Sequence, residues 1–178
     1  MVTFTSELNQ TFIAHWRSLC TASSISVAED YLDRIEPRIA PYILIYDLLA
    51  DDLHVRFQGD EAGKRVGINL TGQSWFSINN YMQKELVLDN CRDCVAYSCG
   101  VWGESIYITA SGREITLENI MVPLAAKDRR PPRLVNISAL MDKIKDEDGK
   151  NSRVVPRRMT WLDVGFGLPP HPMRRRAP

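Results

Sequence analysis

Three cysteines that lie close together in the sequence are the side chains best suited to chemistry. Cys91 and Cys94 are separated by two residues, and Cys99 follows shortly after. Thiolates bind zinc, but a structural zinc site needs four ligands, so Cys20 or a distant histidine would have to supply the fourth. A redox pair would be expected at a helix N-terminus, where the thiol pKa is lowered, whereas this pair follows a predicted helix. We therefore expect free thiols and no bound metal, with a metal or redox protein centred on Cys91, Cys94 and Cys99 as an alternative.

Two further patterns are similar to cofactor sites but lack the residues that such sites need. Residues 59–65 are one residue shorter than a phosphate-binding loop, and no Ser or Thr follows Lys64. Haem would need an axial ligand that points into a core, and His54 alternates out of phase with the apolar residues around it. His15 lies at the edge of a predicted helix and His171 close to the C-terminus. The sequence therefore predicts a turn with solvated charges at residues 59–65 and disfavours haem.

The charges are unevenly distributed, although the formal net charge is zero. From Lys150 onward the chain has seven basic residues and one acidic residue. This composition predicts a domain over residues 1–149 and a basic, Pro/Arg-rich tail over residues 150–178, in which Trp161, Leu162 and Phe166 could dock back on the domain. Basic tails can contact phosphates, so a nucleic-acid-associated regulator is a second alternative. No helix-turn-helix accompanies the arginines, and we expect a solvated or self-docked tail.

The composition is that of a soluble globular protein, with 44% apolar and 25% charged residues. No apolar run approaches the roughly 20 residues that a membrane span requires. The first ten residues lack the basic start and apolar core of a signal peptide. We therefore expect a cytoplasmic protein with no membrane span.

The elements that would position these residues follow from the spacing of apolar side chains. Residues 6–20 predict an amphipathic helix with Leu8, Phe12, Trp16 and Leu19 on one face. Residues 77–90 predict a second helix, and residues 134–144 fit a strand or a helix equally well. Strands are predicted at 42–49, 53–58, 95–102, 105–110 and 113–124, the last with a bulge at Glu118-Asn119 where the alternation slips. This order suits an α+β domain on one antiparallel sheet.

Residues 53–72 combine a predicted half-buried strand with four glycines. Leu53, Val55 and Phe57 alternate with polar residues, so we expect them to share the face that packs on a core. Glycines follow at positions 59, 63, 67 and 72. Glycine is favoured where the backbone needs a positive φ or approaches another segment closely. The stretch carries no catalytic group.

Four patterns in chain order resemble those of a known family. They are His15-Trp16-Arg17, Asp33-Arg34-Ile35-Glu36-Pro37, Arg56-Phe57-Gln58-Gly59 followed by Gly67-Ile68-Asn69-Leu70-Thr71-Gly72, and Ile120-Met121-Val122-Pro123-Leu124. Their order and spacing, over residues 6 to about 140, resemble the single-domain PAS proteins of alphaproteobacteria, the subgroup sometimes called PAS family 5. Asn69 departs from the Asp often found at its position. The resemblance implies a five-stranded antiparallel PAS sheet with helices on one face and an N-terminal amphipathic helix.

The same resemblance implies a sensory or interaction role in bacterial signalling, with no established reaction. It implies homodimerisation through Leu8, Phe12, Trp16 and Leu19, although the helix could instead pack on its own sheet. A small apolar ligand could occupy a pocket lined by Phe57, Asn69, Leu70, Thr71, Trp75, Phe76, Tyr81 and Tyr97, unless these side chains fill a core. Flavin is disfavoured because Leu70 stands where a light-sensing PAS domain has its cysteine, while Asn90-Cys91-Arg92 lies elsewhere. We predict no cofactor, and a module that contacts an unidentified signalling protein.

Overall fold

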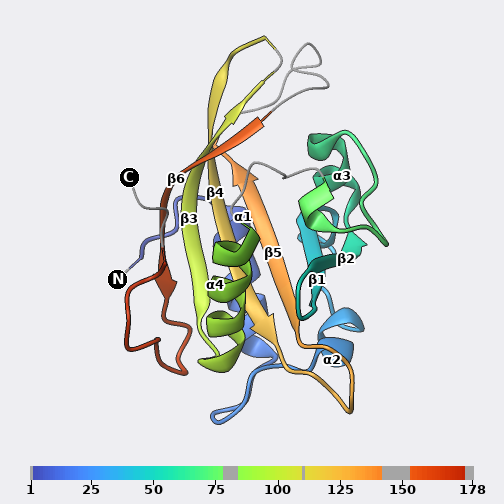
Figure 1. Cartoon of the computed structure of the whole chain (residues 1–178), viewed down its shortest axis with the longest axis vertical. Helices are drawn as coiled ribbons and strands as arrows, with labels where there is room; N and C mark the ends of the chain where they lie inside the picture. Colours follow the sequence, from blue (N-terminus) through green and yellow to red (C-terminus); the bar gives the residue numbers. More distant parts are fainter. Residues whose placement is uncertain (1, 78–83, 110, 142–152, 175–178) are drawn as a thin grey trace.

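The chain is built around one antiparallel sheet of six strands in the order β2-β1-β5-β4-β3-β6 (Figure 1). The computed structural model describes residues 2–77, 84–109, 111–141 and 153–174. The strands are β1 (Ile43–Leu48), β2 (Leu53–Gln58), β3 (Gly100–Ile108), β4 (Glu114–Leu124), β5 (Arg133–Leu140) and β6 (Arg153–Leu162).

Helices cover both faces of this sheet. They are α1 (Glu7–Ser18), α2 (Ala28–Leu32), α3 (Asp60–Val66) and α4 (Lys84–Ala96), with short 3-10 turns η1 (Ala40–Tyr42) and η2 (Trp75–Ser77). In Figure 1, α4 lies in front of the sheet and α1 behind it. Ile43 and Ile45 of β1 pack in an apolar cluster with α1 and α2, which we call the α1-side cluster. Leu44 and Tyr46 pack in the α4-side cluster. A strand buried on both faces has a continuous apolar sequence, as β1 does.

The α+β class and the antiparallel sheet predicted from the sequence are confirmed, but the predicted count of five strands is wrong. The sixth strand, β6, comes from the segment that the sequence predicts to be a tail. It pairs with β3 from Gly100↔Leu162 to Ile108↔Arg153. β6 is an edge strand, residues 155–158 are exposed, and a bulge separates its two halves. Arg, Pro and bulges are typical of edge strands, so this strand lacks the apolar alternation by which inner strands are recognised.

Four other predicted elements have different bounds in the structure. Residues 134–140 are strand, as part of β5, and 142–144 lie outside the described residues. The strands predicted at 95–102 and 105–110 are one strand, β3, which begins at Gly100 because Val95 and Ala96 complete α4. The helix predicted at 77–90 corresponds to α4, of which Lys84–Ala96 is described.

A β-bulge moves Phe57 to the face opposite that of Leu53 and Val55. Ile45 pairs with Phe57 and Tyr46 with Val55, so Arg56 is an extra residue on β2. An extra residue reverses the alternation of every side chain beyond it. Phe57 consequently packs against the α1-side cluster, whereas Leu53 and Val55 lie in the α4-side cluster. The prediction that these three side chains share one face is wrong for Phe57.

Three of the glycines in residues 53–72 are required by the backbone. Gly67, which ends α3, has φ of 80°, and Gly72 has φ of 82°. A Cβ at Gly59 would lie 2.3 Å from the carbonyl oxygen of Ala40 and 2.4 Å from the carbonyl carbon of Pro41. These positions meet the two conditions that favour glycine, positive φ and close approach.

We expect Gly59→Ala to lower the free energy of unfolding by about 1–3 kcal/mol, because the added methyl group must displace backbone atoms. Gly63→Ala is the matched control. It lies inside α3, where the nearest atom to an added Cβ is the flexible Gln58 side chain at 3.4 Å, so alanine should stabilise the helix by about 0.5–1 kcal/mol. Urea denaturation of both variants tests this, and equal effects would contradict it.

The bulge predicted at Glu118-Asn119 is wrong. The apolar alternation slips there because the strand carries a buried carboxylate, Glu118. β4 keeps a continuous register with both neighbouring strands there. Glu118 is 2% exposed. Its Oε1 accepts hydrogen bonds from the Thr5 amide (3.1 Å) and the Trp102 indole (3.1 Å). Its Oε2 accepts from the Ser6 amide (3.0 Å) and the Asn9 side chain (3.0 Å). Glu118 therefore joins the start of α1 to the middle of the sheet.

Glu118→Gln should lower the free energy of unfolding by about 1–3 kcal/mol, the cost of leaving buried donors without an acceptor. Each carboxylate oxygen accepts from two N–H donors, so whichever oxygen becomes the amide nitrogen will face two donors. Glu114→Gln, on the same strand but exposed, should change stability by less than about 0.5 kcal/mol. Thermal or urea denaturation of the pair measures the difference; a neutral Glu118→Gln would contradict the network.

Candidate functional site

Only some of the residues predicted to line a ligand pocket are brought together by the fold. Leu70 is fully buried in the α4-side cluster, and Trp75 and Phe76 pack against it. Phe57 packs on the opposite side of the sheet. Asn69 and Thr71 are exposed, and the Asn69 carboxamide accepts the Thr71 amide in a local turn. Tyr97 lies just beyond the end of α4, and Tyr81 is outside the described residues.

The predicted dimer face of α1 packs against the chain's own sheet. Phe12 and Trp16 are 0% exposed, and Leu8 and Leu19 are partly buried against the same α1-side cluster. The Trp16 indole donates a hydrogen bond to the carbonyl oxygen of Pro123 on β4 (3.1 Å). The sequence allowed two roles for this face, and the described chain uses it for internal packing.

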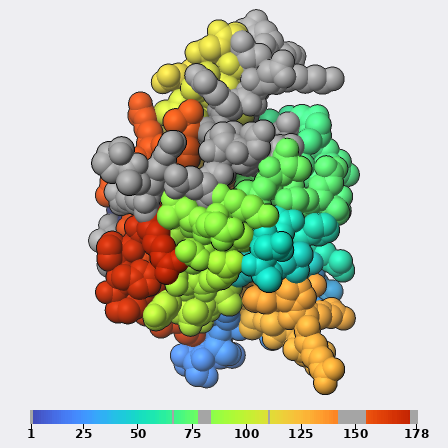
Figure 2. All heavy atoms as spheres, viewed as in Figure 1, coloured from blue at the N-terminus to red at the C-terminus, as the bar shows by residue number. Residues whose placement is uncertain are grey.

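The C-terminal segment, residues 163–174, folds back around the edge of the sheet after β6. Val164 lies in the α1-side cluster, and the rings of Phe166 and Trp16 meet edge to face at 6.4 Å. Gly165 and Gly167 then have φ of 106° and 109°, values that favour glycine. Beyond them the segment reaches the other side of the sheet and lies beside α4, as Figure 2 shows in red and light green.

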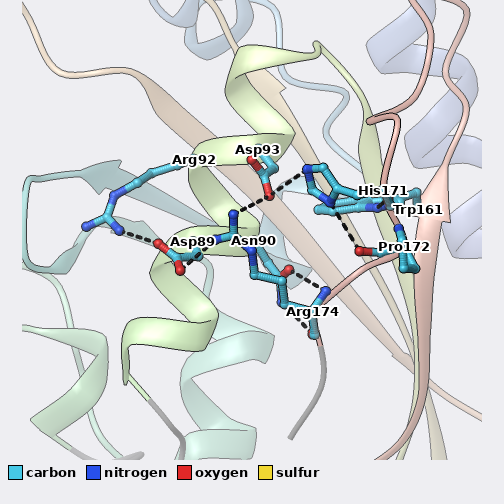
Figure 3. Close-up of polar contacts among 8 residues, drawn as sticks. All are labelled: Asp89, Asn90, Arg92, Asp93, Trp161, His171, Pro172 and Arg174. Atoms are coloured by element: carbon cyan, nitrogen blue, oxygen red, sulfur yellow. Dashed lines mark hydrogen bonds and ion pairs between the residues drawn. The ribbon is translucent and has the colours of Figure 1, made fainter.

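Asn90 of α4 holds the backbone of this segment through both ends of its amide. Its Nδ2 donates to the carbonyl oxygen of Arg174 (3.1 Å), and its Oδ1 accepts the Arg174 amide (3.2 Å). The Asn90 side chain therefore pairs with the backbone as a neighbouring strand would (Figure 3). Asn90 is only 7% exposed, so a displaced segment would leave its amide partly desolvated without these partners.

Two carboxylates one helical turn apart surround this contact with negative charge. Arg174 Nη1 lies 2.5 Å from Asp89 Oδ2, and its Nη2 lies 3.8 Å from Asp93 Oδ2. His171 Nε2 is 3.6 Å from the same Asp93 oxygen. The side chains of Arg174 and Asp89 are 45% and 38% exposed, and exposed ion pairs contribute only about 0–1 kcal/mol. These charges favour a basic segment without binding it tightly.

Aromatic and apolar contacts complete the docking. The His171 ring lies edge to face with Tyr97 (6.3 Å) and with Trp161 (6.4 Å). The Trp161 indole donates to the carbonyl oxygen of His171 (3.1 Å). Met173 is 6% exposed within the α4-side cluster. We name Asp89, Asn90, Asp93 and Tyr97 the α4 docking surface.

The three clustered cysteines lie beneath this surface. Cys91, Cys94 and Cys99 are at most 1% exposed and belong to the α4-side cluster, together with Trp161 and Met173. Burial raises the pKa of the Cys91 thiol to about 12 and also raises the pKa of Cys94. The hydrogen bond from the Cys94 thiol instead lowers the pKa of Cys99. Within the described residues, no group of three or more His, Cys, Asp or Glu side chains could hold a metal ion.

The α4 docking surface was not predicted from the sequence. Two features of the sequence indicate it: Asp89 and Asp93 lie four residues apart on one helix face, and the C-terminal residues carry the opposite, positive charge. The contacts join residues 84 positions apart, and nothing in local spacing shows that two such distant segments meet.

Comparisons with known proteins give no assignment: no protein-family model matches this chain, and no curated protein does. Among the helices of the described residues, none has the length and apolar character needed to cross a membrane.

Asn90→Ala should speed hydrogen exchange of the Arg174 amide by at least about tenfold, because both hydrogen bonds between the Asn90 side chain and the Arg174 backbone are lost. Asp89→Asn is the matched control, since it removes only exposed ion pairs, those with Arg174 and Arg92, and should change the rate by no more than about fivefold. Amide exchange followed by NMR measures both. Equal effects would show that charge, rather than the Asn90 amide, holds the segment.

Proposed function

We propose that this chain is a PAS-type sensory or signalling module that acts through protein–protein contact at the α4 docking surface. The observation that carries the proposal is that a folded sheet domain holds an extended peptide segment on one helix through backbone and side-chain contacts. The antiparallel sheet and the positive φ values of Gly67 and Gly72, in the stretch that resembles the PAS family, support the assignment to that type.

The chemistry of the surface suits an extended, basic peptide. The Asn90 amide pairs with any backbone, whereas Asp89 and Asp93 select for a basic side chain. The ring contacts around His171 and the buried Met173 add shape and apolar area. Backbone pairing combined with pockets for particular side chains is a recurring mode of peptide recognition. A partner that presents a similar segment would meet the same groups that residues 171–174 meet.

In this function the signalling site is a protein contact at the α4 docking surface rather than a ligand pocket. Phe57 and Leu70 pack on opposite sides of the sheet, so these two predicted pocket residues do not line one cavity. Asp89 and Arg174 remain partly exposed, so a competing basic segment can approach Asp89 from solvent. We place the module in the cytoplasm, where the four free thiols would stay reduced.

Photo-crosslinking of the full chain in its own host tests this function. A benzoylphenylalanine in place of Tyr97, the 38% exposed aromatic residue of the docking surface, should capture a specific protein. The same group at Leu49, 39% exposed in the β1–β2 turn, should not. Adding Asn90→Ala to the Tyr97 variant should lower the yield, because it removes the amide that would pair with the partner's backbone.

Mass spectrometry of the adducts distinguishes the alternatives. A second copy of this chain as the adduct would place the predicted homodimer at α4 instead of at α1. A distinct protein would identify the signalling partner. Identical adducts from Tyr97 and Leu49, nucleic acid as the captured molecule, or no adduct at all would contradict the proposed function.

A further inference from the structure

Helix α4 ends in a capping motif that is defined by its backbone hydrogen bonds. The Cys99 amide donates to the carbonyl oxygen of Cys94 (3.1 Å), and the Ser98 amide donates to that of Val95 (3.2 Å). Ser98 has φ of 51°, in the left-handed region. This combination is the Schellman motif, in which the left-handed residue reverses the chain and closes the last helical turn.

The motif brings together the two side chains that flank it. In a Schellman motif, the residue after the left-handed position contacts a residue of the last helical turn, and here those two residues are Cys99 and Cys94. The Cys94 thiol donates to the carbonyl oxygen of Cys99 at 2.7 Å, and both residues are 0% exposed. Two thiols therefore share one closed turn of backbone.

The pKa values of the two neighbouring thiols are shifted in opposite directions. The neighbouring Cys94 thiol lowers the pKa of Cys99, whereas burial raises that of Cys94. A thiolate is the attacking species in thiol–disulfide exchange. Cys99 is thus the group suited to attack, with Cys94 next to it to complete the exchange. Cys91, with its raised pKa, stays protonated at neutral pH.

We propose that Cys94 and Cys99 form a redox-active dithiol that small disulfides, such as glutathione disulfide, oxidise to an intramolecular disulfide across the end of α4. The inference is independent of the proposed function, because it rests on the helix cap alone.

The reaction balances in two exchange steps. Because both thiols are 0% exposed, the exchange takes place when the last turn of α4 opens locally. The Cys99 thiolate then attacks one sulfur of glutathione disulfide, breaks its S–S bond and releases one glutathione thiolate. Cys94 then loses its proton, attacks the Cys99 sulfur of the mixed disulfide and releases the second glutathione. Two protein thiols are oxidised, and one small disulfide is reduced to two thiols.

Peptide mapping of the full-length protein tests the pairing without any variant. The protein is equilibrated in glutathione buffers of increasing oxidised fraction, quenched with acid, alkylated and digested with trypsin. Residues 93–113 contain no Lys or Arg before Arg113, so Cys94 and Cys99 share one tryptic peptide, and Cys91 lies in the preceding one. Oxidation should yield peptide 93–113 lighter by two hydrogen atoms and not alkylated, and dithiothreitol should restore both thiols.

Cys91→Ala is the matched control, because Cys91 is buried in the same cluster one turn before Cys94. This variant should still form the disulfide, whereas Cys99→Ala should not. The proposal is overturned if both thiols of peptide 93–113 are alkylated in every buffer. It is equally overturned if that peptide carries only bound glutathione, or is joined to the peptide that contains Cys91.

Discussion

The fold depends on one buried carboxylate, Glu118, at the centre of the sheet. Ser6, the residue before α1, makes no side-chain capping hydrogen bond, and the amides of Thr5 and Ser6 find their acceptor in Glu118 instead. A negative charge at this position also suits the positive end of the helix dipole. Because α1 covers the α1-side face of the sheet, the polar contact at Glu118 fixes where one whole apolar layer lies. A buried charge of this kind is stable only while all of its donors are in place.

Those parts of the fold that could be predicted from the sequence are the ones that local spacing determines. The apolar face of α1 follows from helical periodicity, and the glycines at 59, 67 and 72 follow from backbone requirements. Phe57 could not be predicted, because a bulge in the pairing of β1 with β2 reverses its direction. Bulges belong to a pair of strands, and a single strand's sequence does not show them. At Glu118 the error was the opposite one. A charged residue interrupts the apolar alternation there, which resembles the effect of a bulge, but the strand keeps its register and buries the charge.

The candidate site was harder to predict than the fold, for a related reason. Each component of the α4 docking surface is ordinary in isolation: an Asn, two Asp residues and a Tyr near a helix end. They form a site only because the chain beyond β6 returns to α4, turning where Gly165 and Gly167 adopt positive φ. The sequence does show the charge asymmetry that favours this contact, with acidic groups in the domain and basic groups near the C-terminus. It does not show the edge strand that carries the segment there.

Helix α4 connects the docking surface to the thiols through its last turn. Asp93 is near Arg174 and His171 on the outside, while the adjacent Cys94 lies in the core. The amide of Tyr97, whose ring packs against His171, donates to the carbonyl oxygen of Asp93, and the amide of Cys99 donates to that of Cys94. The two hydrogen bonds end on the carbonyl groups of consecutive residues, Asp93 and Cys94. Asp93 and Tyr97, the two docking residues in this last turn, are therefore the ones that a backbone change at the Cys94–Cys99 cap would reach first.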